Sequence, residues 1–183
     1  EIVFSQSKKL KSDFVDTIRS LGLTLYHQNK LDEAEENFRE VISITPESED
    51  AYNNLGSTLD KQSKHELAIE NYKKAIDLNP DYLQSYFNLG GVLKRVYKFT
   101  ESEECYRKAI SINPDFIQAY NNLAALLQDL GRFEEAKDLY SRVLELNPSY
   151  VAAHYNYSQL KQFDKYDIHL VQMKKLYLGK SLS

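Results

Sequence analysis

EDAYNNLGSTLDKQSKHELAIENYKKAIDLNPDY, residues 49–82, is the stretch that decides the fold. In its first half, apolar and small residues recur at spacings of three and four, the pattern of one face of an α-helix: Tyr52, Leu55, Gly56 and Leu59. A second series of this kind follows at Leu67, Ala68, Tyr72, Ala75 and Ile76. Pro80 disfavours helix in the residue before it and so ends the second series. The stretch predicts two antiparallel helices joined by a turn near residues 62–63.

The same pattern returns every 34 residues along most of the chain. The four prolines, Pro46, Pro80, Pro114 and Pro148, are each 34 residues apart. A leucine column with the same period is formed by Leu21, Leu55, Leu89 and Leu123. The position after it holds a small residue each time: Gly22, Gly56, Gly90, Ala124 and Ser158. An aromatic column follows at Phe38, Tyr72, Tyr106 and Tyr140. The small residues allow two helices to cross closely, and the rings fill the space that a glycine leaves open.

Each predicted hairpin has an apolar flank, so it must stack on a neighbour to bury that flank. We therefore predict an all-α fold, an α-solenoid that forms a right-handed superhelix of antiparallel helix hairpins. Four full repeats are expected at residues 15–48, 49–82, 83–116 and 117–150. Residues 1–14 are interpreted as an N-terminal segment or the remnant of an earlier helix. Residues 151–183 are expected to form a partial fifth repeat and a capping helix over residues 166–178.

These columns resemble the tetratricopeptide repeat, whose pattern has an aromatic residue, a leucine with a small residue after it, and then alanine, aromatic, alanine and proline. The resemblance covers residues 15–150 closely. The usual tryptophan is replaced by Ile18 or by tyrosine. The resemblance implies that one face of every first helix lines a concave groove that binds other proteins.

An asparagine column lies on the face that the resemblance assigns to the groove. It consists of Asn54, Asn88, Asn122 and Asn156, with Ser20 in the first repeat; we call the four asparagines the asparagine row. Small residues, Ser57, Gly91 and Ala125, lie three positions further on. An asparagine amide offers both a donor and an acceptor, so it can pair with the C=O and N–H of a peptide unit. The row predicts binding of an extended peptide through its main chain.

A structural role competes with ligand binding for the asparagine row, and another competes with it for two nearby cations. Asparagine is a soluble residue that also hydrogen-bonds across adjacent first helices, and this role stays open beside peptide binding. Lys61 and Arg95 lie in adjacent repeats and form either one basic spot in the groove or ordinary solvated surface. Repeats that clamp a C-terminal carboxylate have lysine and arginine at positions that here hold aspartate, glutamine and asparagine, which disfavours that mode of recognition.

Composition and motifs exclude several other classes of function. The net charge of −4 offers no basic stripe for nucleic acid, which places an RNA-binding helical repeat last among the hypotheses. No apolar run approaches the roughly 20 residues of a membrane span. A single cysteine, Cys105, suits a reducing compartment such as the cytoplasm. We find no catalytic motif, metal-ligand spacing or cofactor loop, and predict no enzyme activity, cofactor or metal. Pairs of glutamates at 35–36 and 103–104 are interpreted as solvated outer surface.

Two further resemblances suggest an alternative function. The asparagine row resembles the ladder in the tetratricopeptide arm of glycosyltransferases that attach N-acetylglucosamine to proteins, which implies binding of extended polypeptide substrates. Residues 153–161, with Asp167-Ile168 and residues 173–176, look like the junction between tetratricopeptide repeats and a sulfotransferase-like domain. The alternative is therefore a substrate-recruiting arm of a transferase whose catalytic domain lies beyond Ser183. The first repeat, if uncovered, is also expected to allow self-association.

Overall fold

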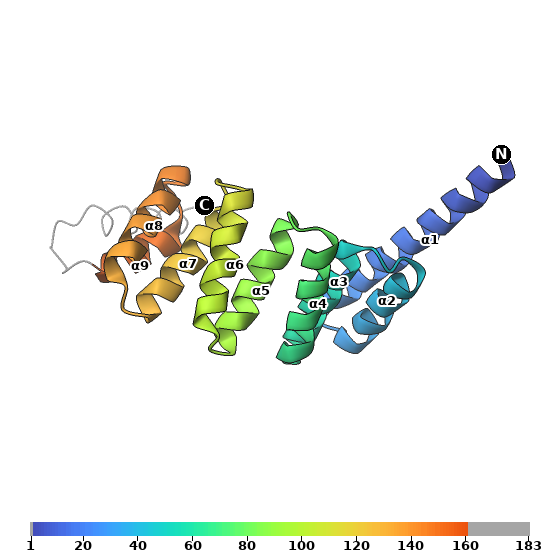
Figure 1. Ribbon diagram of the computed structural model, residues 1–183, viewed down its shortest axis with the longest axis horizontal. Helices are drawn as coiled ribbons and strands as arrows, with labels where there is room; N and C mark the ends of the chain where they lie inside the picture. Colours follow the sequence, from blue (N-terminus) through green and yellow to red (C-terminus); the bar gives the residue numbers. More distant parts are fainter. Residues whose placement is uncertain (1, 161–183) are drawn as a thin grey trace, which may run out of the picture. The chain divides into compact units, whose positions relative to one another are not determined.

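The structure, a computed structural model, describes residues 2–160, with side chains from residue 12 onward. Every regular element in this range is an α-helix, which confirms the predicted all-α repeat fold (Figure 1). The helices are α1 (Ile2–His27), α2 (Leu31–Ile44), α3 (Glu49–Lys61), α4 (His65–Leu78), α5 (Leu83–Arg95), α6 (Phe99–Ile112), α7 (Ile117–Asp129), α8 (Phe133–Leu146) and α9 (Val151–Leu160). The predicted capping helix lies outside the described residues.

The chain divides into two compact units between Lys98 and Phe99. In unit 1, each helix packs against the next one along the chain: α1 against α2, α2 against α3, α3 against α4, and α4 against α5. In unit 2, α7 packs against both α6 and α8, and α9 packs against α8. The division falls inside the predicted third repeat, and α1 runs unbroken across the predicted boundary at residues 14–15. The assignment of residues 15–150 to four equivalent repeats stays a prediction.

The turns between helices recur with the period of the sequence. Three asparagines precede prolines at the ends of α4, α6 and α8, and each side-chain Oδ1 accepts from the backbone N–H two residues on, at 3.0–3.2 Å: Asn79, Asn113 and Asn147. This local bond competes with helix and starts a turn. Within each hairpin, one residue has a positive φ, at Asn29, Ser63, Tyr97 and Gly131. These four are again 34 apart, so a left-handed residue reverses the chain after each of α1, α3, α5 and α7.

The small-residue column lets the helices of a hairpin approach closely, as its sequence predicts. A Cβ atom added to Gly56 would lie 2.8 Å from Tyr72 Cε1, and one on Gly22 would lie 2.9 Å from Phe38 Cε1. Both rings are almost fully buried, Tyr72 at 1% exposed and Phe38 at 0%. Each ring therefore packs directly against its glycine, and this contact limits the separation of the two helices.

Within residues 2–160, one flank of α1 lacks the cover that later first helices have. Leu55, Leu89 and Leu123 are 5%, 4% and 0% exposed, because the preceding second helix of their own unit packs against them. Leu21 occupies the same column and is 50% exposed. This uncovered flank is the surface on which self-association was predicted, and that prediction stays open.

Glu35 is buried, although the sequence indicated solvated outer surface. It is 6% exposed; Lys64 Nζ donates to its Oε2 at 2.9 Å, and Arg39 pairs with it from the next turn of α2. The neighbouring Glu36 is exposed, as expected. The prediction is wrong for Glu35 because two basic side chains compensate its charge, so that it can leave water at an acceptable cost in free energy.

Unit 2 repeats this arrangement 68 residues later. Glu103 accepts from Arg132 Nη1 at 2.5 Å and from Arg107 Nη2 at 2.7 Å, and its side chain is 16% exposed. Glu135 also accepts from Arg132, at 2.6 Å. Solvated surface is therefore the wrong interpretation of Glu103 as well. In both units, an ion-paired glutamate ties the second helix of one hairpin to the start of the next second helix.

We expect Glu35→Ala to lower the free energy of unfolding by about 1–2 kcal/mol at neutral pH, because it removes charge-assisted hydrogen bonds from a buried acceptor. Burial raises the pKa of the Glu35 carboxyl, but hydrogen bonds from Lys64 and Gln62 and the charge of Arg39 outweigh it, so that the net pKa lies below 4.5. A carboxyl whose pKa is depressed by folding stabilises the fold above its unfolded pKa. That contribution disappears as the pH falls through the folded pKa.

Urea unfolding at neutral pH and near pH 3 measures both effects. The gap between wild type and Glu35→Ala should narrow at the lower pH. Glu36→Ala, on the same helix and exposed, should change stability by no more than about 0.5 kcal/mol. An equal loss in both variants, or a gap that is independent of pH, would contradict the role of the buried pair.

Candidate functional site

The predicted site residues lie in both units. Unit 1 carries Asn54, Ser57 and Lys61 on α3 and Asn88, Gly91 and Arg95 on α5. Unit 2 carries Asn122 and Ala125 on α7 and Asn156 on α9. The four asparagines are all half-buried, yet they make different hydrogen bonds. Their environments therefore separate the two interpretations of the asparagine row residue by residue.

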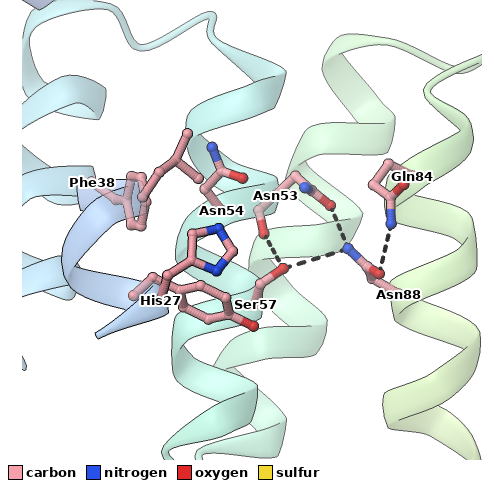
Figure 2. A pocket seen from close by; sticks show the side chains of 9 residues that line it. His27, Phe38, Asn53, Asn54, Ser57, Gln84 and Asn88 are labelled. Atoms are coloured by element: carbon pink, nitrogen blue, oxygen red, sulfur yellow. Dashed lines mark hydrogen bonds between the residues drawn. The ribbon is translucent and has the colours of Figure 1, made fainter. Parts of the chain in front are cut away.

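Asn88 is held in a network that joins α3 to α5. Its Nδ2 donates to Asn53 Oδ1 at 3.0 Å and lies 3.4 Å from Ser57 Oγ. Its Oδ1 accepts from Gln84 Nε2 at 3.0 Å, one turn earlier on α5 (Figure 2). Both ends of the amide are thus used within the protein. For Asn88 the structure gives the inter-helix role that competed with peptide binding.

Asn53 is the centre of this network, and sequence reasoning missed it. The residue is 4% exposed, and its Oδ1 also accepts from Ser85 Oγ at 3.1 Å. It precedes the asparagine row by one position, where the later first helices have Phe87, Asn121 and Tyr155. No column of like residues marks the position, so the only signal was the doubled asparagine at 53–54, repeated at 121–122.

The amide of Asn54 is uncommitted. Within the described residues its side chain makes no hydrogen bond, and Figure 2 shows it beside the pocket with no interaction drawn to it. An amide that is half-buried and has no protein partner can offer its donor and its acceptor to a ligand. Of the two interpretations, Asn54 therefore suits the binding role.

In unit 2 the two asparagines also differ. Asn122 Oδ1 has only a long contact, 3.5 Å, from Asn121 Nδ2. Asn156 hydrogen-bonds the phenol of Tyr140, whose Oη also donates to Gln128 Oε1 at 3.2 Å. Burial raises the pKa of Tyr140 to about 12, so this phenol keeps its proton and its donor role at neutral pH. Asn122 thus resembles Asn54, whereas Asn156 is used within the protein like Asn88.

The two predicted groove cations both have partners. Lys61 Nζ donates to the backbone oxygen of Tyr26 at 3.2 Å and lies 4.6 Å from the centre of the Tyr26 ring. Arg95 forms an ion pair with Asp60, whose other oxygen lies 3.1 Å from His65 Nδ1. Both cations tie one first helix to the one before it, which draws them away from a shared basic spot.

A pocket of about 300 Å³ opens between the first helices of unit 1. Its lining residues from α1 and α2 are Leu23, Tyr26, His27 and Phe38, and those from α3 and α5 are the polar residues Asn53, Asn54, Ser57, Gln84 and Asn88. Figure 2 shows Phe38 and His27 across from Gln84 and Asn88, with Asn54 between them. Three predicted site residues, Asn54, Ser57 and Asn88, thus share one concavity, and Lys61 reaches the ring of Tyr26 beside it.

No helix among the described residues has a stretch long and apolar enough to cross a membrane. No cluster of three or more His, Cys, Asp or Glu side chains in that part of the chain is arranged to bind a metal ion.

Comparisons with known proteins agree with the periodic sequence. A family model described as "Tetratricopeptide repeat" matches residues 49–82 and 117–150, and one described as "TPR repeat" matches residues 22–63 and 98–131. Together these matches span more than half of the chain. No curated protein matches the sequence.

Solved structures share the fold at low sequence identity. The crystal structure of MamA is 19% identical, with a TM-score of 0.74 over 88% of this chain and 95% of that one. The first TPR of Spaghetti (RPAP3), bound to the HSP90 peptide SRMEEVD, is 22% identical, with a TM-score of 0.62 over 64% and 93%. YrrB, titled a TPR protein with an unusual peptide-binding site, is 17% identical, with a TM-score of 0.68 over 94% and 90%. The repeat matches, which together span more than half of the chain, establish that the chain belongs to the tetratricopeptide repeat family, whose fold these structures share.

Proposed function

We propose that the chain is a protein-interaction scaffold that binds an extended peptide and has no catalytic role. The observation that carries the proposal is the uncommitted Asn54 amide beside a pocket of about 300 Å³. Two proteins of similar fold are described as peptide binders, RPAP3 with an HSP90 peptide and YrrB with a peptide-binding site. The comparisons offer no support for the alternative of a transferase arm.

The proposal divides the asparagine row by role. Asn54 contacts the main chain of a peptide bound to unit 1, and Asn122 is the amide with the same binding capacity in unit 2, because these two amides are the least used by the protein. Asn88 and Asn156 hold neighbouring side chains in place, through Asn53 and Tyr140 respectively. The small side chains of Ser57, Gly91 and Ala125 leave room for a peptide backbone to approach; Lys61 and Arg95 shape the site through their bonds to α1 and α3.

The test compares Asn54→Ala with Asn88→Ala, using a peptide selected against the whole chain from a random library displayed on phage. Asn54→Ala should weaken affinity about tenfold, the effect of losing about 1.4 kcal/mol of hydrogen bonding, and leave stability nearly unchanged. Asn88→Ala should lower the free energy of unfolding by about 1 kcal/mol, because buried Asn53 loses a donor. Isothermal titration calorimetry and urea unfolding measure the two effects.

Asn71→Ala is the matched control, since its Nδ2 donates only to the backbone of its own helix on α4, at 2.8 Å. It should leave peptide affinity unchanged. The proposal fails if the library yields no peptide that binds, or if Asn54→Ala and Asn71→Ala bind the selected peptide equally well.

A further inference from the structure

We infer that the pocket of unit 1 selects an uncharged aromatic or long aliphatic side chain of the bound peptide, while Asn54 holds the main chain of that anchor residue. The inference rests on the proposed function and adds to it the chemical class of the ligand. It follows from three properties of the pocket: its size, the charges around it, and the division of its lining into an apolar and a polar side.

The size of the pocket suits a single large side chain. Its volume of about 300 Å³ lies at the lower end of the roughly 300–1,000 Å³ range of small-molecule sites. A peptide crossing the pocket can therefore insert one side chain there and must continue past it on either side. Leu23, which is 37% exposed, and the half-buried Tyr26 provide the apolar surface on which such a side chain is buried.

Charge argues against an acidic or basic anchor. The nine lining residues include no Asp, Glu, Lys or Arg, and His27 is the only one with a basic ring. The nearby cations are committed, Lys61 to the Tyr26 carbonyl and ring and Arg95 to Asp60. A carboxylate or ammonium entering the pocket would lose water without gaining a counter-charge, which costs several kcal/mol.

The aromatic side of the pocket favours a ring in particular. Tyr26 and His27 already pack edge to face, with ring centres 5.5 Å apart and planes at 76°. A third ring packed on Leu23 beside Tyr26 would extend this cluster, and aromatic pairs add about 0.5–1.5 kcal/mol beyond buried area. The amide of Asn54, which has no hydrogen bond within the described residues, also lines the pocket, where it can pair with the backbone of the residue that supplies the ring.

The experiment uses the whole chain and the phage-selected peptide. An alanine scan of the peptide identifies its anchor, which we expect to be Phe, Tyr, Trp, Leu, Ile or Met. Replacing the anchor by Glu or Lys should weaken binding at least tenfold. Leu23→Glu in the protein places a carboxylate at the pocket; it should weaken the apolar peptide at least tenfold and bind the Lys-anchored peptide more tightly than wild type does.

Thr24→Glu is the control, because Thr24 is exposed on the same helix and does not line the pocket. It should preserve the preference for the apolar anchor, and circular dichroism should show both variants folded. This inference alone is overturned if the alanine scan identifies a charged anchor. It is also overturned alone if an apolar-anchored peptide binds Leu23→Glu as tightly as wild type while Asn54→Ala weakens its binding. If neither Leu23→Glu nor Asn54→Ala affects binding, the proposed function itself is overturned.

Discussion

Tyr72→Ala is expected to lower the free energy of unfolding by about 3–5 kcal/mol, the usual cost of removing a buried ring from a core. The Tyr72 side chain is 1% exposed and packs closely against Gly56. Its loss therefore leaves a cavity between α3 and α4 that a glycine has no side chain to fill. Urea unfolding followed by circular dichroism measures the change.

Two further variants separate the ring from its hydroxyl. Tyr72 Oη donates to Ser57 Oγ at 3.1 Å, so Tyr72→Phe should cost only about 1 kcal/mol. Tyr155→Ala removes a ring that is 53% exposed on α9 and should cost less than about 1 kcal/mol. If Tyr72→Phe proves as damaging as Tyr72→Ala, the hydrogen bond and not the packing of the ring governs this hairpin.

Gly56→Val is expected to lower the free energy of unfolding by about 2–3 kcal/mol, because its Cβ would lie 2.8 Å from Tyr72 Cε1 before any methyl group is counted. The ring has no free space into which it can move, since it is almost fully buried. The helix propensity gained by losing a glycine, under about 1 kcal/mol, offsets only part of this cost.

A double-mutant cycle tests the cause of this loss. With Tyr72→Ala in place, the valine occupies space that the ring has vacated, so the two losses should combine to clearly less than their sum. Strictly additive losses would mean that Gly56 is required for a reason other than contact with Tyr72. Either result is read from the same urea unfolding curves.

The periodic features of the fold could be predicted from the sequence, because they depend on contacts repeated in register. The columns of Gly56 and Tyr72 predicted the close helix crossing, and the Asn-Pro pairs coincide with the ends of α4, α6 and α8. A residue that makes the same contact in each repeat leaves a column, and a column can be read without a structure.

Features that occur once or twice could not be predicted in this way. Asn53 is buried at the centre of a network although no column marks it, and Glu35 is buried because Lys64 lies beside it across the stack. The asparagine row shows, conversely, that residues in one column can have different hydrogen-bond partners. Asn54 and Asn88 share a column, yet only Asn88 has Asn53 and Gln84 within hydrogen-bonding distance. Which neighbours a side chain reaches depends on packing between helices, which spacing along the chain does not determine.

The central claim is that a peptide binds beside Asn54, and the most direct measurement is the ¹H–¹⁵N spectrum of the side-chain amides during titration with the selected peptide. The account predicts that the Asn54 side-chain amide shifts progressively and saturates with the peptide, while that of Asn71 on α4 stays in place. Saturating binding that leaves the Asn54 amide and the backbone amides of Leu23 and Tyr26 unshifted would contradict it.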